Sequence, residues 1–151
     1  MTRVFQILAN RGRIRGVAER GDQGRTSPLS IVLIGAPRTK KNHGKVIKRG
    51  GRKFHVSSDA YEAWNASVQM QLAMARAKES DLPFRGHVNV RAFFYRHADV
   101  GDAVGFYQGL ADALQEGRIL ENDRQIRSWN GSLLLTDAAN PRTVVTIEVL
   151  S

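Results

Sequence analysis

An apolar stripe at helical spacing is the feature that most constrains the fold of this chain. Within residues 58–78 apolar side chains recur every three or four positions: Tyr61, Trp64, Val68, Leu72 and Ala75. This spacing predicts an amphipathic helix, with Ser58 as its N-cap and with Asp59 and Glu62 in its first turn. Because such a helix has one apolar side, it must pack against a second layer of structure.

Strand-like segments can supply that layer. Residues 30–35 are short and β-branched, residues 87–96 alternate in polarity, and residues 143–150 form a clear final strand. Residues 45–48 and 52–56 predict a hairpin around Arg49-Gly50-Gly51, and shorter strands are expected at 119–120 and 125–129.

A second helix is predicted over residues 103–116, with Asp102 as its cap and Gly117 as its stop signal. Its expected buried side consists of Val104, Tyr107, Leu110, Ala111 and Leu114. The expected fold class is therefore α+β (mixed α/β), a small single domain with a mixed sheet and two main helices. This domain spans residues 28–151, and residues 1–27 are interpreted as a basic flexible arm.

Composition excludes several classes of protein. The chain contains no cysteine, which rules out a disulfide framework, thiolate zinc and a cysteine nucleophile. Its longest aliphatic run is residues 31–34, too short to span a bilayer. The formal net charge of +9 favours a polyanionic partner.

Charge is distributed unevenly along the chain. Residues 37–53 hold eight basic residues and no acid, whereas residues 99–123 hold six acids and one arginine. The basic segment predicts phosphate contacts, from Lys40, Lys41, Asn42, Lys45, Lys48, Arg49, Arg52 and Lys53. The alternative is a solvated basic loop without a ligand.

Two acids stand where a cation site could form. Asp102 begins the second predicted helix, and Asp123 follows the short strand at 119–120. Mg²⁺ takes one or two protein carboxylates and completes its shell with waters and substrate phosphates. The alternatives are a plain N-cap for Asp102 and a turn residue for Asp123.

Three sequence fragments, taken in order, carry a family resemblance. They are Pro37-x-x-Lys40-Lys41-Asn42, then Ser57/Ser58-x-x-Tyr61-x-x-Trp64, then Asp102…Asp112-Ala113-Leu114…Asn122-Asp123-Arg124-Gln125-Ile126. In this order and spacing the chain resembles the RusA-type Holliday-junction resolvases of bacteria, phages and prophages. The resemblance covers roughly residues 30–150, so that residues 28–151 would form a RusA-like endonuclease domain.

The resemblance implies a homodimeric, Mg²⁺-dependent endonuclease, with Mn²⁺ as a substitute, that places paired nicks across four-way DNA junctions. It further implies a cytoplasmic, nucleoid-associated protein of a bacterial cell or a phage-infected host. The family's aspartate triad maps onto Asp102, Val104 and Asp123, and its lysine maps onto Gln108. Since two of these positions depart from the family pattern, Asp99 and Glu121 are candidate replacement ligands.

Two other functions stay open at this point. The chain could be a catalytically weakened or silent protein that binds DNA junctions with the same fold. It could also be a basic accessory protein that packages nucleic acid.

Overall fold

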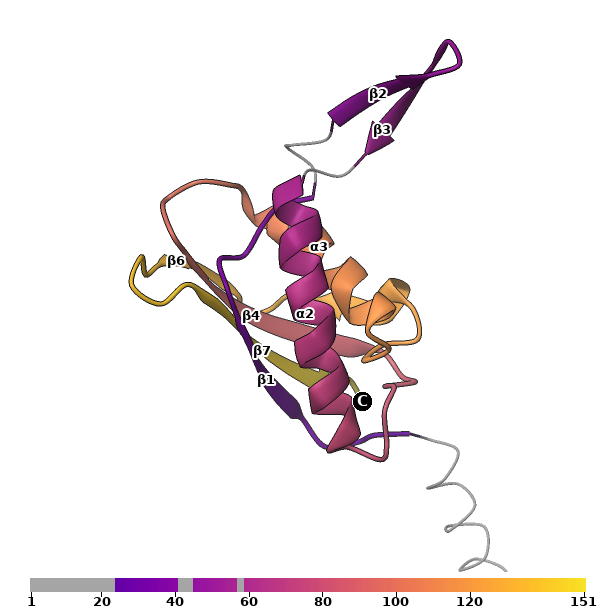
Figure 1. Ribbon diagram of the computed structural model, residues 1–151. Helices are drawn as coiled ribbons and strands as arrows, with labels where there is room; N and C mark the ends of the chain where they lie inside the picture. The colour runs from indigo at the N-terminus through magenta and orange to yellow at the C-terminus, as the bar shows by residue number, and fades with distance from the viewer. Residues whose placement is uncertain (1–23, 41–44, 57–58) are drawn as a thin grey trace, which may run out of the picture.

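The computed structural model describes residues 24–40, 45–56 and 59–151 (Figure 1). The elements are β1 (Leu29–Ile34), β2 (Lys45–Arg49), β3 (Arg52–Val56), α2 (Asp59–Ala77), β4 (Val88–Arg96), α3 (Ala103–Glu116), the 3₁₀ turn η1 (Asp123–Gln125), β5 (Ile126–Ser128), β6 (Leu133–Thr136) and β7 (Arg142–Val149). The predicted N-cap Ser58 lies outside the described residues.

A five-stranded mixed sheet forms one layer of the domain. Strand β7 lies between β1 and β4 and is antiparallel to both. On its other side β4 pairs in parallel with β5 near its start and with β6 near its end. Because β1 and β4 are both antiparallel to β7, they run in the same direction and end at the same edge of the sheet.

Helices α2 and α3 form the second layer, and both lie on the same face of the sheet (Figure 1). The stripe predicted for α2 is buried at Tyr61, Trp64, Val68 and Leu72. It packs with alternate residues of the sheet, among them Leu33, Val90 and Ile147. The prediction of a small α+β domain with a mixed sheet and two helices is confirmed.

The buried side of α3 differs from the predicted one. Val104 is 60% exposed, whereas Gly105, Phe106, Gly109, Leu110, Ala113 and Leu114 are buried. Tyr107 and Ala111 are half-buried. The buried side of α3 is therefore rotated about the helix axis relative to the predicted one. In its first turns, glycines face the body of the domain.

The hairpin β2–β3 forms a separate two-stranded sheet that stands off the end of the body (Figure 1). Its strands are joined by Gly50 and Gly51, whose φ values are +57° and +78°. Positive φ at both central residues defines the tight turn that suits the twist of a hairpin, and glycine adopts it without strain. The predicted hairpin is confirmed, with β2 one residue longer than expected.

The ordered body begins ahead of the predicted boundary at residue 28. Arg25, assigned to the arm from sequence, is 9% exposed and pairs with Glu79 at 2.7 Å and with Asp81 at 2.9 Å. Its guanidinium also donates to the carbonyl oxygens of Ser27 and Pro28. Arg25 thus links the segment before β1 to the segment that follows α2. Residues 1–23 lie outside the described residues.

Replacing Arg25 with glutamine is expected to destabilise the domain. The two carboxylates are partly exposed, which screens the pairing, so we expect a loss of about 1–3 kcal/mol. Thermal unfolding measures this loss, and Arg76→Gln, an exposed arginine on α2, is the matched control. An unchanged melting temperature for the Arg25 variant would mean that its ion pairs contribute nothing net.

No helix in the part of the chain that the structure describes is long and apolar enough to cross a membrane.

Candidate nucleic-acid and metal site

One edge of the sheet gathers the segments that sequence analysis singled out. Residues 35–40 leave the end of β1 and lead to the hairpin. Residues 97–102 leave the end of β4 and lead into α3. Because β1 and β4 end at the same edge, the base of the hairpin and the start of α3 are neighbours.

Two glycines of α3 let the hairpin's base pass close to the helix. A Cβ at Gly105 would lie 3.0 Å from Thr39, and one at Gly109 would lie 3.1 Å from the carbonyl oxygen of Arg38. Lys40 then pairs with Asp112, the next turn along, at 2.7 Å. Thr39 itself is buried. The segment before the hairpin is thus fixed against α3, the helix that Asp102 caps.

Tyr61 completes this junction from α2. Its hydroxyl donates to the carbonyl oxygen of Gly109 at 3.1 Å, and its ring packs against Trp64. Burial, together with the nearby carboxylates of Asp112 and Glu116, raises the pKa of Tyr61 well above its ordinary value. The phenol therefore stays protonated and keeps donating over the whole working pH range.

Asp102 is the N-cap of α3. Its Oδ1 accepts a hydrogen bond from the backbone N–H of Gly105 at 2.8 Å, and the residue is exposed. One carboxylate oxygen is therefore engaged in capping, and the second has no partner among the described residues. Capping does not by itself remove Asp102 from a metal site, because a carboxylate has acceptor capacity on both oxygens.

Asp123 is held in place by the turn that contains it. Asn122 and Gln125 form a reciprocal capping box, and the backbone N–H of Asp123 donates to Gln115 at 2.8 Å. Gln125 is buried and donates to the carbonyl oxygens of Phe84 and Gly86. The turn is thereby linked to α3 and to the segment that precedes β4, while the Asp123 carboxylate has no partner among the described residues.

A groove of about 280 Å³ brings together residues that are separated in the sequence. Asp123 lines it with Val104 and Gln108 of α3, over a floor that includes Tyr107 and Trp129. These two rings stack at 4.5 Å with their planes 4° apart. Three of the four positions that the family resemblance assigns to catalysis, Val104, Gln108 and Asp123, thus share one groove. Asp102, the fourth, lies two residues before Val104.

The two candidate replacement ligands lie elsewhere. Asp99 is 89% exposed and pairs with Arg96 at 2.9 Å. Glu121 lies 3.8 Å from Arg85, and neither acid lines the groove. Within residues 24–40, 45–56 and 59–151 no three acidic or histidine side chains gather closely enough to hold a metal ion. Asp123 is therefore the one acid among the described residues that lines the groove, and Asp102 precedes Val104, another residue of the groove, by two positions.

The tip of the hairpin concentrates positive charge. Lys48 lies directly opposite Lys53, Arg49 lies opposite Arg52, and all four residues are exposed. Like charges directly opposite on paired strands destabilise the pairing. Stability alone therefore does not favour this tip, whereas a polyanion bound across it would relieve the repulsion.

The remaining predicted phosphate ligands have different surroundings. Lys40 is engaged with Asp112, and Lys45 lies in β2 with its side chain outside the described part. Lys41 and Asn42 lie outside the described residues altogether. Among the basic side chains of the hairpin that the structure describes, those of its tip are unpaired.

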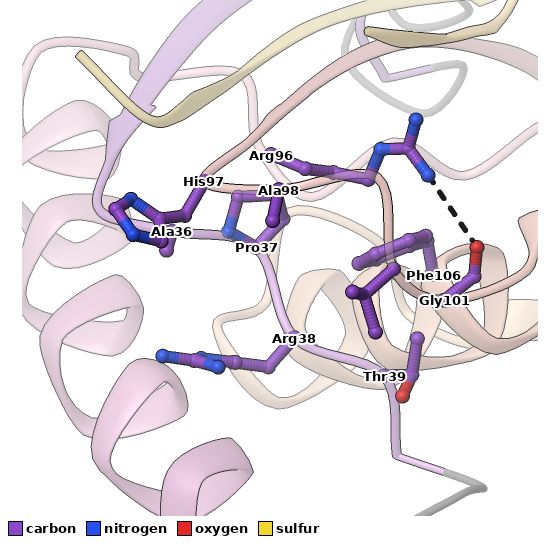
Figure 2. Close-up of a pocket in the computed structure, with 10 residues that line it drawn as sticks. Ala36, Pro37, Arg38, Thr39, Arg96, His97, Ala98, Gly101 and Phe106 are labelled. Carbon is purple, nitrogen blue, oxygen red and sulfur yellow. Dashed lines mark hydrogen bonds between the residues drawn. The ribbon is translucent and has the colours of Figure 1, made fainter. Parts of the chain in front are cut away.

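A pocket of about 230 Å³ at the same sheet edge adds two residues that were not assigned from sequence (Figure 2). Figure 2 shows Arg38 and His97 on the same side of Pro37, while Arg96 points the other way and donates to the carbonyl oxygen of Gly101. Among the described residues Arg38 and His97 have no hydrogen-bond or ion-pair partner. Both side chains are therefore available to donate hydrogen bonds to a phosphate. Their proximity depends on β1 and β4 being parallel, which no local signal reveals.

In comparisons with known proteins, no family model matches this chain and no curated protein is significantly similar to it.

Proposed function

We propose that this protein is a Mg²⁺-dependent endonuclease of the RusA type that cuts branched DNA, four-way junctions above all, as a homodimer. The convergence of Val104, Gln108 and Asp123 on one groove is the observation that supports it most. The resemblance names these positions from sequence order alone, although Gln108 and Asp123 are fifteen residues apart. The proposed setting is the cytoplasm of a bacterial cell or a phage-infected host, close to the nucleoid.

Two carboxylates fit a magnesium ion that DNA helps to bind. Asp102 retains a free oxygen beside its cap, and the Asp123 carboxylate is unpaired in the described part of the chain. One or two carboxylates plus substrate phosphate oxygens satisfy Mg²⁺, and the ion keeps several waters. When bound, Mg²⁺ would polarise the phosphodiester and lower the pKa of a bound water.

The chain's own residues supply binding and orientation. The hairpin tip, together with Arg38 and His97, would hold phosphates at the edge of the sheet from which α3 starts. The base of the hairpin is fixed on α3 by the Lys40–Asp112 pair, so a bound backbone would be positioned relative to Asp102. Orientation of this kind is a large part of what an active site contributes.

Cleavage of a synthetic four-way junction, with and without Mg²⁺, tests the proposed function. Symmetric paired nicks that require Mg²⁺, with linear duplex of the same sequence left uncut, are the expected result. Equal cutting of duplex and junction would contradict the proposed substrate.

A silent junction-binding protein is the second candidate. The uncharged Val104 and Gln108 favour it, because the family pattern has an aspartate and a lysine at these positions. Junction-selective binding without any nick in Mg²⁺ or Mn²⁺ would identify this function. Equal affinity for every DNA shape would instead indicate a nucleic-acid-packaging protein.

DNA affinity is expected to fall steeply with salt. If about five phosphates are neutralised, the plot of log affinity against log salt should have a slope near −4 to −5. The double variant Lys48→Ser/Lys53→Ser, at the hairpin tip, should reduce the slope by about 2, since each duplex phosphate contributes about −0.9. Fluorescence anisotropy measures the dissociation constant of each variant at salt concentrations from about 50 to about 200 mM, over which phosphate contacts lose most of their affinity.

The matched control removes the same charge from another surface. Arg76→Ser/Lys78→Ser alters two exposed cations near the end of α2 that is remote from the hairpin. This variant should keep the wild-type slope. If both double variants change the slope equally, the hairpin tip has no special role in binding DNA.

A further inference from the structure

An apolar row crosses the face of the sheet that lies opposite α2 and α3. Leu29, Ile31 and Leu33 of β1 are buried under the helices, so Val32 points to the other face. Strand register places Val32 opposite Val144, Val144 opposite Phe93, and Phe93 opposite Leu133. These four residues, the apolar row, run across β1, β7, β4 and β6 without a polar interruption.

The apolar row is uncovered in the part of the chain that the structure describes. Val32 and Leu133 are 51% and 52% exposed, and Val144 and Phe93 are half-buried. Both helices lie on the opposite face (Figure 1). An antiparallel sheet with one solvated face ordinarily presents polar side chains there, so a continuous apolar row indicates a contact surface.

Polar residues border the apolar row. Towards the amino end of β4 the next row consists of Ser30, Thr146 and Arg91 in register. Glu148 follows Thr146 by two positions on β7 and therefore lies on the same face. Among the described residues Glu148 has no partner. The face thus has an apolar centre that is bordered by an unpaired acid, Glu148, and by an exposed arginine, Arg91.

We propose that a second copy of this chain packs on the apolar row, sheet face against sheet face, about a two-fold axis parallel to the strands. A two-fold axis through the middle of the row superposes the row on its own copy, which makes the surface self-complementary. The inference rests on the proposed function in one respect: paired nicks need two active sites.

Charge complementarity favours this axis. With the axis along the strands, β7 of one subunit faces β4 of the other, and Val144 faces the partner's Phe93. Arg91 then lies over Thr146 of the partner subunit, two positions from its Glu148. The symmetry forms this arginine–glutamate pair twice, once on each side of the two-fold axis.

The axis direction also decides where the two DNA-binding edges lie. An axis along the strands keeps both sets of strands pointing the same way. Both hairpins and both α3 starts then lie at one end of the dimer, where a single junction can contact them. With an axis across the strands, the two DNA-binding edges would lie at opposite ends of the dimer. A single junction could then not contact both edges from one side.

Oligomeric state gives the first test. Light scattering of the wild-type chain should give about twice the 16.8 kDa of one subunit. Val32→Glu/Leu133→Glu should raise the dissociation constant at least about 100-fold, because the dimer would bury unpaired charges. Met70→Glu/Met74→Glu, at exposed apolar positions of α2, is the matched control and should stay dimeric. A wild-type monomer, or a Val32→Glu/Leu133→Glu dimer of unchanged affinity, would overturn the proposal.

Cross-linking tests the axis, and the absence of native cysteine makes the assay clean. Facing sheets pack about 10 Å apart, beyond disulfide reach, so a short bismaleimide is the linker. With the axis along the strands, Val32 faces the partner's Leu133, and the double variant Val32→Cys/Leu133→Cys should link into dimers while each single variant should not. Efficient linking of either single variant would overturn the proposed axis.

The outcomes separate this inference from the proposed function. A monomeric wild type that still nicks junctions would overturn the inference and the homodimer, and would leave the endonuclease activity standing. A dimer through the apolar row that cuts nothing would overturn the endonuclease alone. A monomer whose single cysteine at position 32 resists maleimide would assign the cover to another segment of the same chain, which also overturns the inference.

Discussion

Replacing Asp123 with asparagine is expected to reduce Mg²⁺-dependent junction cleavage by roughly a thousandfold, while junction binding stays intact or tightens. The carboxylate lines the groove, and its turn is held by the Asn122–Gln125 capping box, which the substitution leaves in place. A metal contributes several kcal/mol to such a transition state, and 1.36 kcal/mol corresponds to about tenfold in rate. Binding persists because an anionic group near the phosphates has been removed.

Asp102→Asn should reduce Mg²⁺-dependent cleavage to a similar extent, and this variant can separate the charge of Asp102 from its role as an N-cap. Asparagine is as good an N-cap as aspartate, so the bond to the Gly105 N–H and the stability of α3 should be retained. The variant therefore isolates the negative charge from the capping role. Cleavage rates under single turnover, with melting temperature as the check on folding, separate the two contributions.

Glu121→Gln is the matched control for both substitutions. It removes an exposed acid two residues from Asp123 that pairs weakly with Arg85 and does not line the groove. This variant should cut at close to the wild-type rate. Should Asp123→Asn cut normally while Glu121→Gln fails, the metal lies on the other side of the turn and the ligand assignment is wrong.

Local periodicity accounts for the elements that were predicted well. The α2 stripe and the α3 boundaries at 103 and 116 follow from side chains within a few turns of one another. The glycine turn of the hairpin is equally local. Strand β6 was not predicted, because Leu133, Leu134 and Leu135 show no alternation and pair with β4 about forty residues earlier. Such pairing has no signature within the strand itself.

The error at Val104 has a non-local cause. A stripe drawn from hydrophobicity favours valine over glycine, so Val104 was assigned to the buried side and Gly105 was not. In the fold, the chain at Thr39 passes so close to α3 that a Cβ at Gly105 would lie 3.0 Å from it. Close backbone approach selected the glycine for burial and turned Val104 outward. The same contact could not be inferred without knowing that β1 and β4 end together.

The candidate site could be predicted only in part, because it also depends on contacts between residues that are far apart in the sequence. Order and spacing of motifs indicated Asp102 and Asp123, but the contact between α3 and η1 is what brings Asp123 to the groove. Arg38 and His97 come from segments about sixty residues apart, and neither was among the site residues predicted from sequence. Topology unites them at one pocket.

Val104→Asp is expected to tighten Mg²⁺ binding and to raise the cleavage rate at least about tenfold at limiting Mg²⁺. Val104 lines the groove with Asp123 and is 60% exposed, so the substitution buries no charge in the core. It also adds an acid to the first turn of α3, which the structure describes in full and which contains none. The helix dipole favours a carboxylate there by roughly 0.3–1 kcal/mol.

Met70→Asp is the matched control for this gain. It places a carboxylate at an exposed apolar side chain of α2 that lines neither the groove nor the Arg38–His97 pocket. Melting temperature and cleavage rate are followed as Mg²⁺ is titrated against wild type and both variants. A Mg²⁺-dependent gain confined to Val104→Asp means that the groove is the cation site. If Val104→Asp is stable yet gains neither rate nor Mg²⁺-dependent stability, the groove does not hold the ion, and the silent junction-binding function is favoured instead.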